Sequence, residues 1–281
     1  LWVEKTGTNT EWLARQLAKF ADVPARDIGY AGLKDRHAIT RQWFSVPRWN
    51  SPAWGAMDIE GADLLDVQRH SKKLRRGAHR SNAFRIVMRG DHLEKHGEAL
   101  AERIEAIRAL GVPNYFGEQR FGRGGANLGL ADMWANGKRL PRHKRSIAIS
   151  TIRSFLFNEA LDERVRDGTW NVLLPGDTAN LDGTASVFDV DEVDEELLQR
   201  CAAMDVHPAG ELAGDGSDEG PAAWLAALGK ARVDKGTRSL RLKVAGLAAQ
   251  TSGDAVVLSF TLGRGAFATA VLREIAQAAS A

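Results

Sequence analysis

The residues best suited to chemistry lie in one stretch, 29–46. Two glycines and an alanine lead into Lys34-Asp35-Arg36-His37, where one carboxylate lies among three potential cations. A carboxylate beside cations is favoured in its ionised form, which a nucleophile or general base requires. Glycine lets the backbone approach a ligand closely. The alternative is solvated surface charge, since exposed ion pairs contribute little to stability.

Regular elements on both sides must position this loop. Residues 1–5 alternate like a strand, and residues 42–46 are also strand-like. Asn9 or Thr10 can cap a helix that runs to about Phe20. The candidate loop therefore lies among elements of both kinds.

The rest of the chain also mixes strands with helices. Strands are predicted at 64–67, 84–89, 240–244 and 255–262, the last two as a hairpin with its turn at 251–254. Helices are predicted to end at Leu110, to cover 145–166, and to span about 266–279. A helical insertion into an α+β domain fits this order better than two domains in series.

Charge is segregated along the sequence although the net charge is only +2. Residues 69–89 contain eight Lys or Arg and no Asp or Glu, and residues 138–145 contain five more. Residues 189–219 contain eleven acids and one base. This pattern favours a basic face for a polyanion such as nucleic acid, unless the fold interleaves the runs.

Cysteine content and hydropathy exclude several classes of protein. Cys201 is the only cysteine, so neither an intrachain disulfide nor a Cys-based zinc site can form within one chain. No apolar run reaches the length of a membrane span, and the start does not resemble a signal peptide. We therefore expect a cytoplasmic protein. Because the chain starts at Leu1 in a strand-like run, we also expect it to lack its natural beginning.

A second loop, residues 111–125, combines five glycines with aromatic residues and arginines. Such a loop can stack on bases and hold phosphates through Tyr115, Phe116 and Arg120. It lacks the Gly-Lys-Ser/Thr ending of a P-loop and the strand–helix setting of a dinucleotide-binding motif. The alternative, which has equal weight, is that this loop is a purely structural turn packed by its own aromatic residues.

Several stretches of the sequence are more specific than its overall composition. They are residues 31–42, 81–84, 112–122, 154–158, 175–177 and 265–274. In this order, and over nearly the whole chain, the sequence resembles the TruD-type tRNA pseudouridine synthases. The resemblance implies isomerisation of uridine to pseudouridine in tRNA, at position 13, without a metal or an organic cofactor. It also implies an α+β fold: a catalytic domain with a mixed sheet, at 1–110 and 237–281, interrupted by an α/β insertion domain at 111–236.

The resemblance also assigns roles to residues. Asp35 matches the catalytic aspartate, Phe84 the aromatic that stacks on the target base, and Asn82 a polar residue that helps to position the aspartate loop. The other expected substrate-binding residues are Lys34, Arg36, Tyr115, Phe116, Arg120 and Arg273. Among them, Lys34, Arg36 and Arg273 are alternative cations beside Asp35. We expect a monomer that binds tRNA and neither a membrane nor a metal.

Two other functions compete with this one. The family begins with a further segment that carries an acidic and a basic residue near the active site, and we expect that segment to be missing. A catalytically impaired RNA-binding module or RNA chaperone is therefore the main alternative. A metal-dependent nuclease is disfavoured, because the histidines are scattered without ligand spacing.

Overall fold

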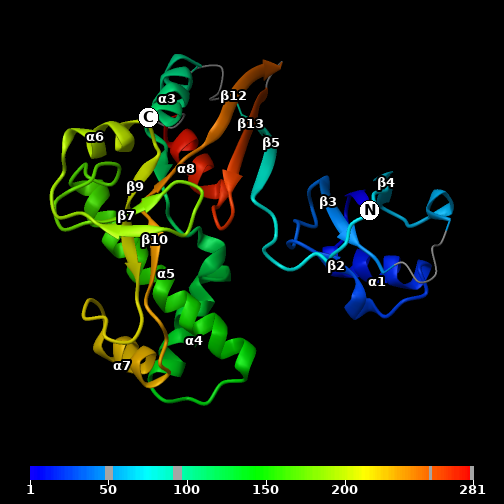
Figure 1. Cartoon of the computed structure of the whole chain (residues 1–281), viewed down its shortest axis with the longest axis horizontal. Helices are drawn as coiled ribbons and strands as arrows, with labels where there is room; N and C mark the ends of the chain where they lie inside the picture. The colour runs from blue at the N-terminus through cyan, green and yellow to red at the C-terminus, as the bar shows by residue number, and fades with distance from the viewer. Residues whose placement is uncertain (48–52, 91–96, 253–254, 279–281) are drawn as a thin grey trace. The chain divides into compact units, whose positions relative to one another are not determined.

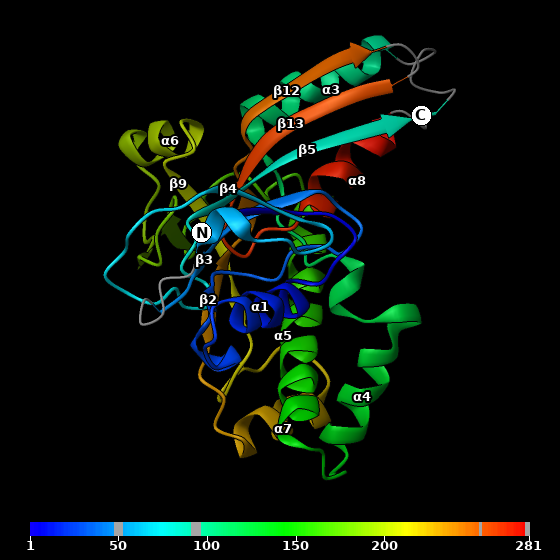
Figure 2. The ribbon, with the colours of Figure 1, turned by 90° about the vertical axis from the view of Figure 1, so that its right-hand side faces the viewer.

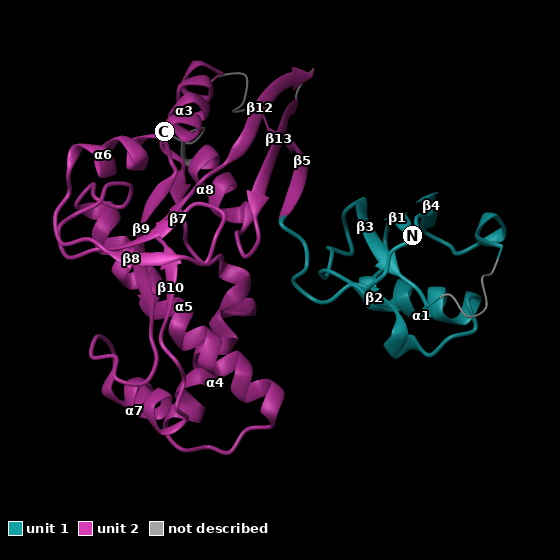
Figure 3. Ribbon diagram, in the orientation of Figure 1, with its two compact units in different colours: residues 1–80 teal, residues 81–281 magenta. Residues whose placement is uncertain are grey.

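The computed structural model describes residues 1–47, 53–90, 97–252 and 255–278. The chain divides into two compact units, residues 1–80 (unit 1) and residues 81–281 (unit 2) (Figure 1, Figure 3). Both units combine helices with antiparallel sheets, which confirms the α+β class. The discontinuous catalytic domain and its insertion remain a prediction.

Unit 1 is built on a four-stranded antiparallel sheet. Its strands lie in the order β2 (Gly29–Tyr30), β3 (Thr40–Ser45), β1 (Trp2–Lys5) and β4 (Ala62–Asp66). Helix α1 (Thr10–Phe20) buries Leu13 and Leu17 against Val3 and Phe44 of the sheet. Two short 3₁₀ turns, η1 (Ala25–Asp27) and η2 (Trp54–Ala56), lie in the connections.

Strand β1 alternates as the sequence predicts, and this places a lysine in the interior. Leu1, Val3 and Lys5 are 8%, 1% and 2% exposed, whereas the residues between them are half-buried. Successive side chains of a strand point to opposite faces of its sheet. Lys5 therefore shares the apolar face with Leu1 and Val3.

Unit 2 contains a three-stranded antiparallel sheet that packs against two helices. Figure 2 shows β12 (Ala245–Ser252), β13 (Ala255–Gly263) and β5 (Ser81–Arg89) side by side. Helices α3 (Gly97–Leu110) and α8 (Ala268–Ala278) share one hydrophobic core with these strands. The hairpin predicted between residues 240–244 and 255–262 is wrong in its first strand, because β13 pairs with β12, with Ser252 opposite Ala255. Thr251 and Ser252 of the predicted turn belong to β12, and residues 253–254 lie outside the described residues.

The remainder of unit 2 is a second sheet with a group of helices. The sheet order is β10 (Gly236–Ser239), β9 (Val206–Leu212), β7 (Thr178–Leu181) and β8 (Val187–Asp189), with helix α6 (Glu195–Ala202) beside it. Helix α5 (Arg142–Arg166) packs with α4 (Ala126–Ala135) and β9, and α7 (Ala222–Lys230) packs with α4. The 3₁₀ turns η3 (Glu118–Arg120) and η4 (Arg123–Gly125) lead into α4.

The strand predicted over residues 240–244 is wrong for most of its length. Only β11 (Arg241–Leu242) is a strand there, paired with β6 (Val112–Pro113). Arg241 is 3% exposed, as deeply buried as Leu240 beside it, because its guanidinium donates to carbonyl oxygens of Asn171, Cys201 and Val206. A polar residue in an apolar alternation marks an exposed face only when the fold offers it no internal partners.

Candidate active site

Asp35 lies on the loop between β2 and β3, with its side chain exposed. Its Oδ1 accepts a hydrogen bond of 2.9 Å from the backbone N–H of His37. One donor leaves most of the lone pairs of an ionised carboxylate available, since such a group can accept about four hydrogen bonds. The loop therefore presents a reactive oxygen to whatever approaches it.

Lys5 holds the Asp35 loop from below. Its Nζ donates a hydrogen bond of 2.7 Å to the backbone oxygen of Asp35. Burial lowers the pKa of Lys5, the negative charge of Asp35 opposes that change, and Lys34 adds to it. Lys5 is a cation that joins the interior of unit 1 to the backbone of the candidate nucleophile, and it is not among the residues predicted from the sequence. The alternation of residues 1–5 would have indicated it, because a lysine on an apolar face needs a partner.

Thr10 and Gly7 hold the residues on either side of Asp35. The backbone N–H of Lys34 donates to Thr10 Oγ1 over 2.9 Å, and Arg36 Nε donates to the backbone oxygen of Gly7 over 3.2 Å. Thr10 is 1% exposed, and its hydroxyl binds the loop. Neither predicted capping residue caps α1 with its side chain. Burial also lowers the pKa of Lys34.

The first part of the basic run packs beside this loop in unit 1. The backbone N–H of Gly77 donates to the Ala31 oxygen over 2.7 Å, and the Arg76 guanidinium lies 4.1 Å from the ring centre of Tyr30. A Cβ at Gly29 would lie 2.5 Å from the carbonyl oxygen of Leu74. Gly29 is thus required by this neighbouring backbone. The contacts place exposed cations next to the segment that carries Asp35.

Asn82 and Phe84 lie in unit 2, on the same face of β5, and both are half-buried. The register pairs Phe84 with Phe260 of β13, and their rings stack with centroids 5.3 Å apart and planes at 24°. Phe260 is core, so it supports Phe84 from the interior. Asn82 and Phe84 are brought together, whereas Asp35 belongs to the other unit.

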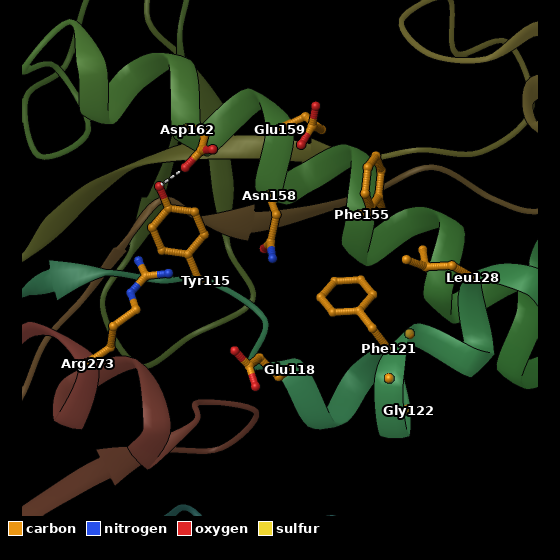
Figure 4. Close-up of a pocket in the computed structure, with 12 residues that line it drawn as sticks. Tyr115, Glu118, Phe121, Gly122, Leu128, Phe155, Asn158, Glu159, Asp162 and Arg273 are labelled. Carbon is orange, nitrogen blue, oxygen red and sulfur yellow. Dashed lines mark hydrogen bonds between the residues drawn. The ribbon is translucent and has the colours of Figure 1, made fainter.

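Tyr115 and Arg273 line a pocket of about 470 Å³ in unit 2 (Figure 4). The Tyr115 hydroxyl donates to Asp162, and the Arg273 guanidinium lies 4.1 Å from the Tyr115 ring centre. Burial raises the pKa of Tyr115, and the hydrogen bond to Asp162 adds to the effect. The other lining residues labelled in Figure 4 are Glu118, Phe121, Gly122, Leu128, Phe155, Asn158 and Glu159.

Phe116 and Arg120 form a second contact in the same loop. Asn158 fixes the backbone of Phe116 from both sides, accepting from its N–H over 2.9 Å and donating to its oxygen over 3.0 Å. The Arg120 guanidinium lies 5.4 Å from the Phe116 ring centre and 5.8 Å from that of Phe267. The loop thus joins aromatic faces to a cation, as its composition indicates, and Phe267 is an aromatic partner that we did not predict.

The described residues contain no group of three or more His, Cys, Asp or Glu side chains placed to hold a metal ion. In the same part of the chain, no helix has the length and apolar character needed to cross a membrane.

Comparisons with known proteins agree with these motifs. Residues 1–128 match the family model described as tRNA pseudouridine synthase D (TruD). A relative named tRNA pseudouridine synthase D from Nitrosococcus oceani is 42% identical, over 96% of this chain and 81% of its own length. Relatives of the same name from Methylococcus capsulatus and Pseudomonas aeruginosa are 42% and 44% identical, over 99% and 98% of this chain and 83% and 82% of their own lengths.

A solved structure shows the same fold. It is titled as a putative tRNA pseudouridine synthase D from Methanosarcina mazei, and it superposes with a TM-score of 0.75 over 98% of this chain and 87% of that chain. The two sequences are only 19% identical, so this likeness concerns the fold. The relatives found by sequence show the family as well as the fold. The chain belongs to the TruD family of tRNA pseudouridine synthases.

Proposed function

We propose that this chain isomerises uridine to pseudouridine in tRNA and that Asp35 is the nucleophile. Position 13 is the site that the resemblance implies. The observation that carries the proposal is the Asp35 loop: an exposed carboxylate whose backbone is held by Lys5 and whose neighbour Lys34 is held by Thr10. We further propose that the chain acts as a monomer in the cytoplasm, without a metal or an organic cofactor.

The reaction needs a positioned carboxylate more than it needs any other group. The bond between N1 of uracil and C1′ of ribose breaks, the base rotates, and C5 bonds to C1′. The proton on C5 leaves and N1 gains a proton, so the product is an isomer of the substrate. An ionised carboxylate can attack the sugar or the base, and it can accept the C5 proton. Asp35 is exposed enough to meet a substrate and restrained enough to meet it in one geometry.

The target base must leave its stack before the carboxylate can reach it, at a cost of a few kcal/mol. We propose that Phe84 offsets part of this cost by stacking on the base. Stacking on an aromatic ring contributes about 1–3 kcal/mol per base. The support of its ring by Phe260 favours this role, because a fixed ring loses little freedom on binding. In the same proposal Asn82 helps to position the aspartate loop.

We propose that the remaining predicted residues contact RNA outside the target base. Lys34 and Arg36 flank Asp35 in unit 1, and Tyr115, Phe116, Arg120 and Arg273 lie in unit 2. In unit 2, the guanidinium of Arg120 lies over the Phe116 ring and that of Arg273 over the Tyr115 ring, and these pairs support this role. Flat rings stack on bases, and cations neutralise phosphates.

The test is substitution of Asp35 by asparagine, which keeps the shape and removes the charge. Pseudouridine in tRNA incubated with the chain is mapped by mass spectrometry. We expect Asp35→Asn to abolish product while tRNA binding persists, and Asp63→Asn, at an exposed position on β4, to leave turnover unchanged. Substantial turnover by folded Asp35→Asn would refute the assignment. Binding without turnover by the unsubstituted chain would favour the RNA-binding alternative.

A further inference from the structure

Two arginines from distant parts of unit 2 meet at one aromatic ring. Arg120 comes from η3 and Arg238 from β10, and their guanidinium carbons lie 5.4 Å and 4.1 Å from the centre of the Phe116 ring. Arg120 also lies 5.8 Å from the ring of Phe267. Both arginines are half-buried, so each keeps some access to solvent.

Within the described residues, the side chain of Arg238 donates hydrogen bonds only to neutral groups. Its Nε and one terminal nitrogen donate to the backbone and side-chain oxygens of Asn114 over 3.2 Å and 2.6 Å, and the other terminal nitrogen donates to Gly265 O over 3.2 Å. An arginine has five N–H groups, so three are used here and two are left. These bonds fix the orientation of the guanidinium and leave its charge uncompensated.

Arg120 is less satisfied still. Its Nε is buried without a hydrogen-bond partner. Its guanidinium lies over two aromatic rings, and the ion pairs found in the described part of the chain include neither Arg120 nor Arg238. A structural role explains Arg238, which ties Asn114 to Gly265. It does not explain Arg120.

This arrangement brings two positive charges close together in a partly desolvated site. Burial lowers the pKa of Arg238 to about 10, and the charge of Arg120 contributes to that change. Burial also lowers the pKa of Arg120, with no carboxylate acting against it. Charges removed from water without a counter-charge are costly, and such groups gather at sites that bind a ligand of opposite sign.

We propose that Arg120 and Arg238 together bind one phosphodiester group of RNA. The inference rests on the proposed function for its RNA ligand and assigns to Arg238 a role that the sequence did not indicate. The free N–H groups of two guanidinium forks match the oxygens of a phosphate, which accept paired hydrogen bonds from arginine. Phe116 and Phe267 keep water from part of the site, which strengthens each charged contact.

The experiment measures tRNA affinity against salt concentration for the whole chain and for Arg120→Gln. Among the residues that the structure describes, the side chain of Arg120 has no hydrogen-bond partner, so we expect this variant to fold normally. We expect at least about tenfold weaker binding, as for the loss of a charge-assisted hydrogen bond. We also expect the slope of log affinity against log salt to fall by about 0.7–0.9, the value for one phosphate.

Two further variants complete the design. Arg238→Lys keeps the charge but loses the fork, and we expect weaker binding with a nearly unchanged salt slope. Arg200→Gln is the matched control, because Arg200 is a partly exposed arginine of unit 2 whose guanidinium is already paired with Asp205 at 2.8 Å. We expect it to leave both affinity and slope unchanged.

The outcomes separate this proposal from the proposed function. If folded Arg120→Gln binds tRNA with the affinity and slope of the unsubstituted chain, the proposed binding of an RNA phosphodiester is refuted, even where pseudouridine still forms. If the slope falls as expected but no pseudouridine forms, the phosphate site stands and the proposed function fails. If inorganic phosphate raises the melting temperature of the unsubstituted chain more than that of Arg120→Gln while tRNA affinity is equal, the site takes free phosphate and the RNA assignment is overturned.

Discussion

Lys5→Met tests whether the buried lysine acts by holding the Asp35 loop. Lys5 is 2% exposed, and its Nζ lies 2.7 Å from the Asp35 oxygen. A hydrogen bond to a charged group contributes about 1.5–3 kcal/mol. Complete loss of that contribution from the transition state corresponds to a rate between about 10-fold and 150-fold lower. Methionine is chosen because it is unbranched, fits a similar space, and carries no charge.

We expect the effect of Lys5→Met on stability to have the opposite sign to its effect on the rate. Lys5→Met removes an ammonium group from a buried site, which relieves its desolvation cost. The carbonyl that it leaves behind belongs to a loop of mostly exposed residues, where water can replace the donor. We therefore expect the melting temperature to stay the same or rise while the rate falls. A variant that lost both would indicate a damaged fold.

The assay is single-turnover pseudouridine formation, with tRNA affinity measured separately. We expect the rate constant to fall and the dissociation constant to stay within about twofold, since a positioning contact acts on the reacting group. Lys19→Met is the matched control, because Lys19 is an exposed lysine of α1 in the same unit. A wild-type rate for Lys5→Met, with a melting temperature at least as high, would refute the reasoning.

Two further predictions concern unit 2. His207 accepts from Arg241 at Nδ1 and contacts Asp182 through Nε2, and burial lowers its pKa. As the pH falls, His207 therefore becomes protonated in the unfolded chain before it does in the folded chain. Stability falls as pH drops below about 6.5 toward the lowered folded-state pKa. We expect His207→Gln to flatten this part of the melting-temperature profile. Parallel profiles would contradict the prediction, and exposed His143→Gln is the control. For Phe84→Leu, which keeps an apolar side chain but loses the stacking face, we expect turnover at least about fivefold lower. Unchanged turnover, measured with tRNA below saturation, would exclude the stacking role.

Local sequence determined much of the fold and the centre of the candidate site. The alternation of residues 84–88 predicts β5, with Phe84, Ile86 and Met88 on the face that packs against the core. Helical spacing predicts α1 and most of α5. The Asp35 loop is identified by residues that are neighbours in the chain, which is why both its composition and its family resemblance are visible without a structure.

The tertiary structure alone decided which distant groups meet. Lys5 reaches the Asp35 backbone across 30 positions of sequence, and Arg238 reaches Asn114 across 124. The residue type does not indicate the partner in either case, because a lysine in a strand or an arginine near a hairpin is usually solvated. Arg241 is a further example, because carbonyl oxygens of Asn171, Cys201 and Val206, which are distant in sequence, converge on its guanidinium. Periodicity determines which face a side chain occupies, whereas the charge that it meets there depends on how separate elements pack.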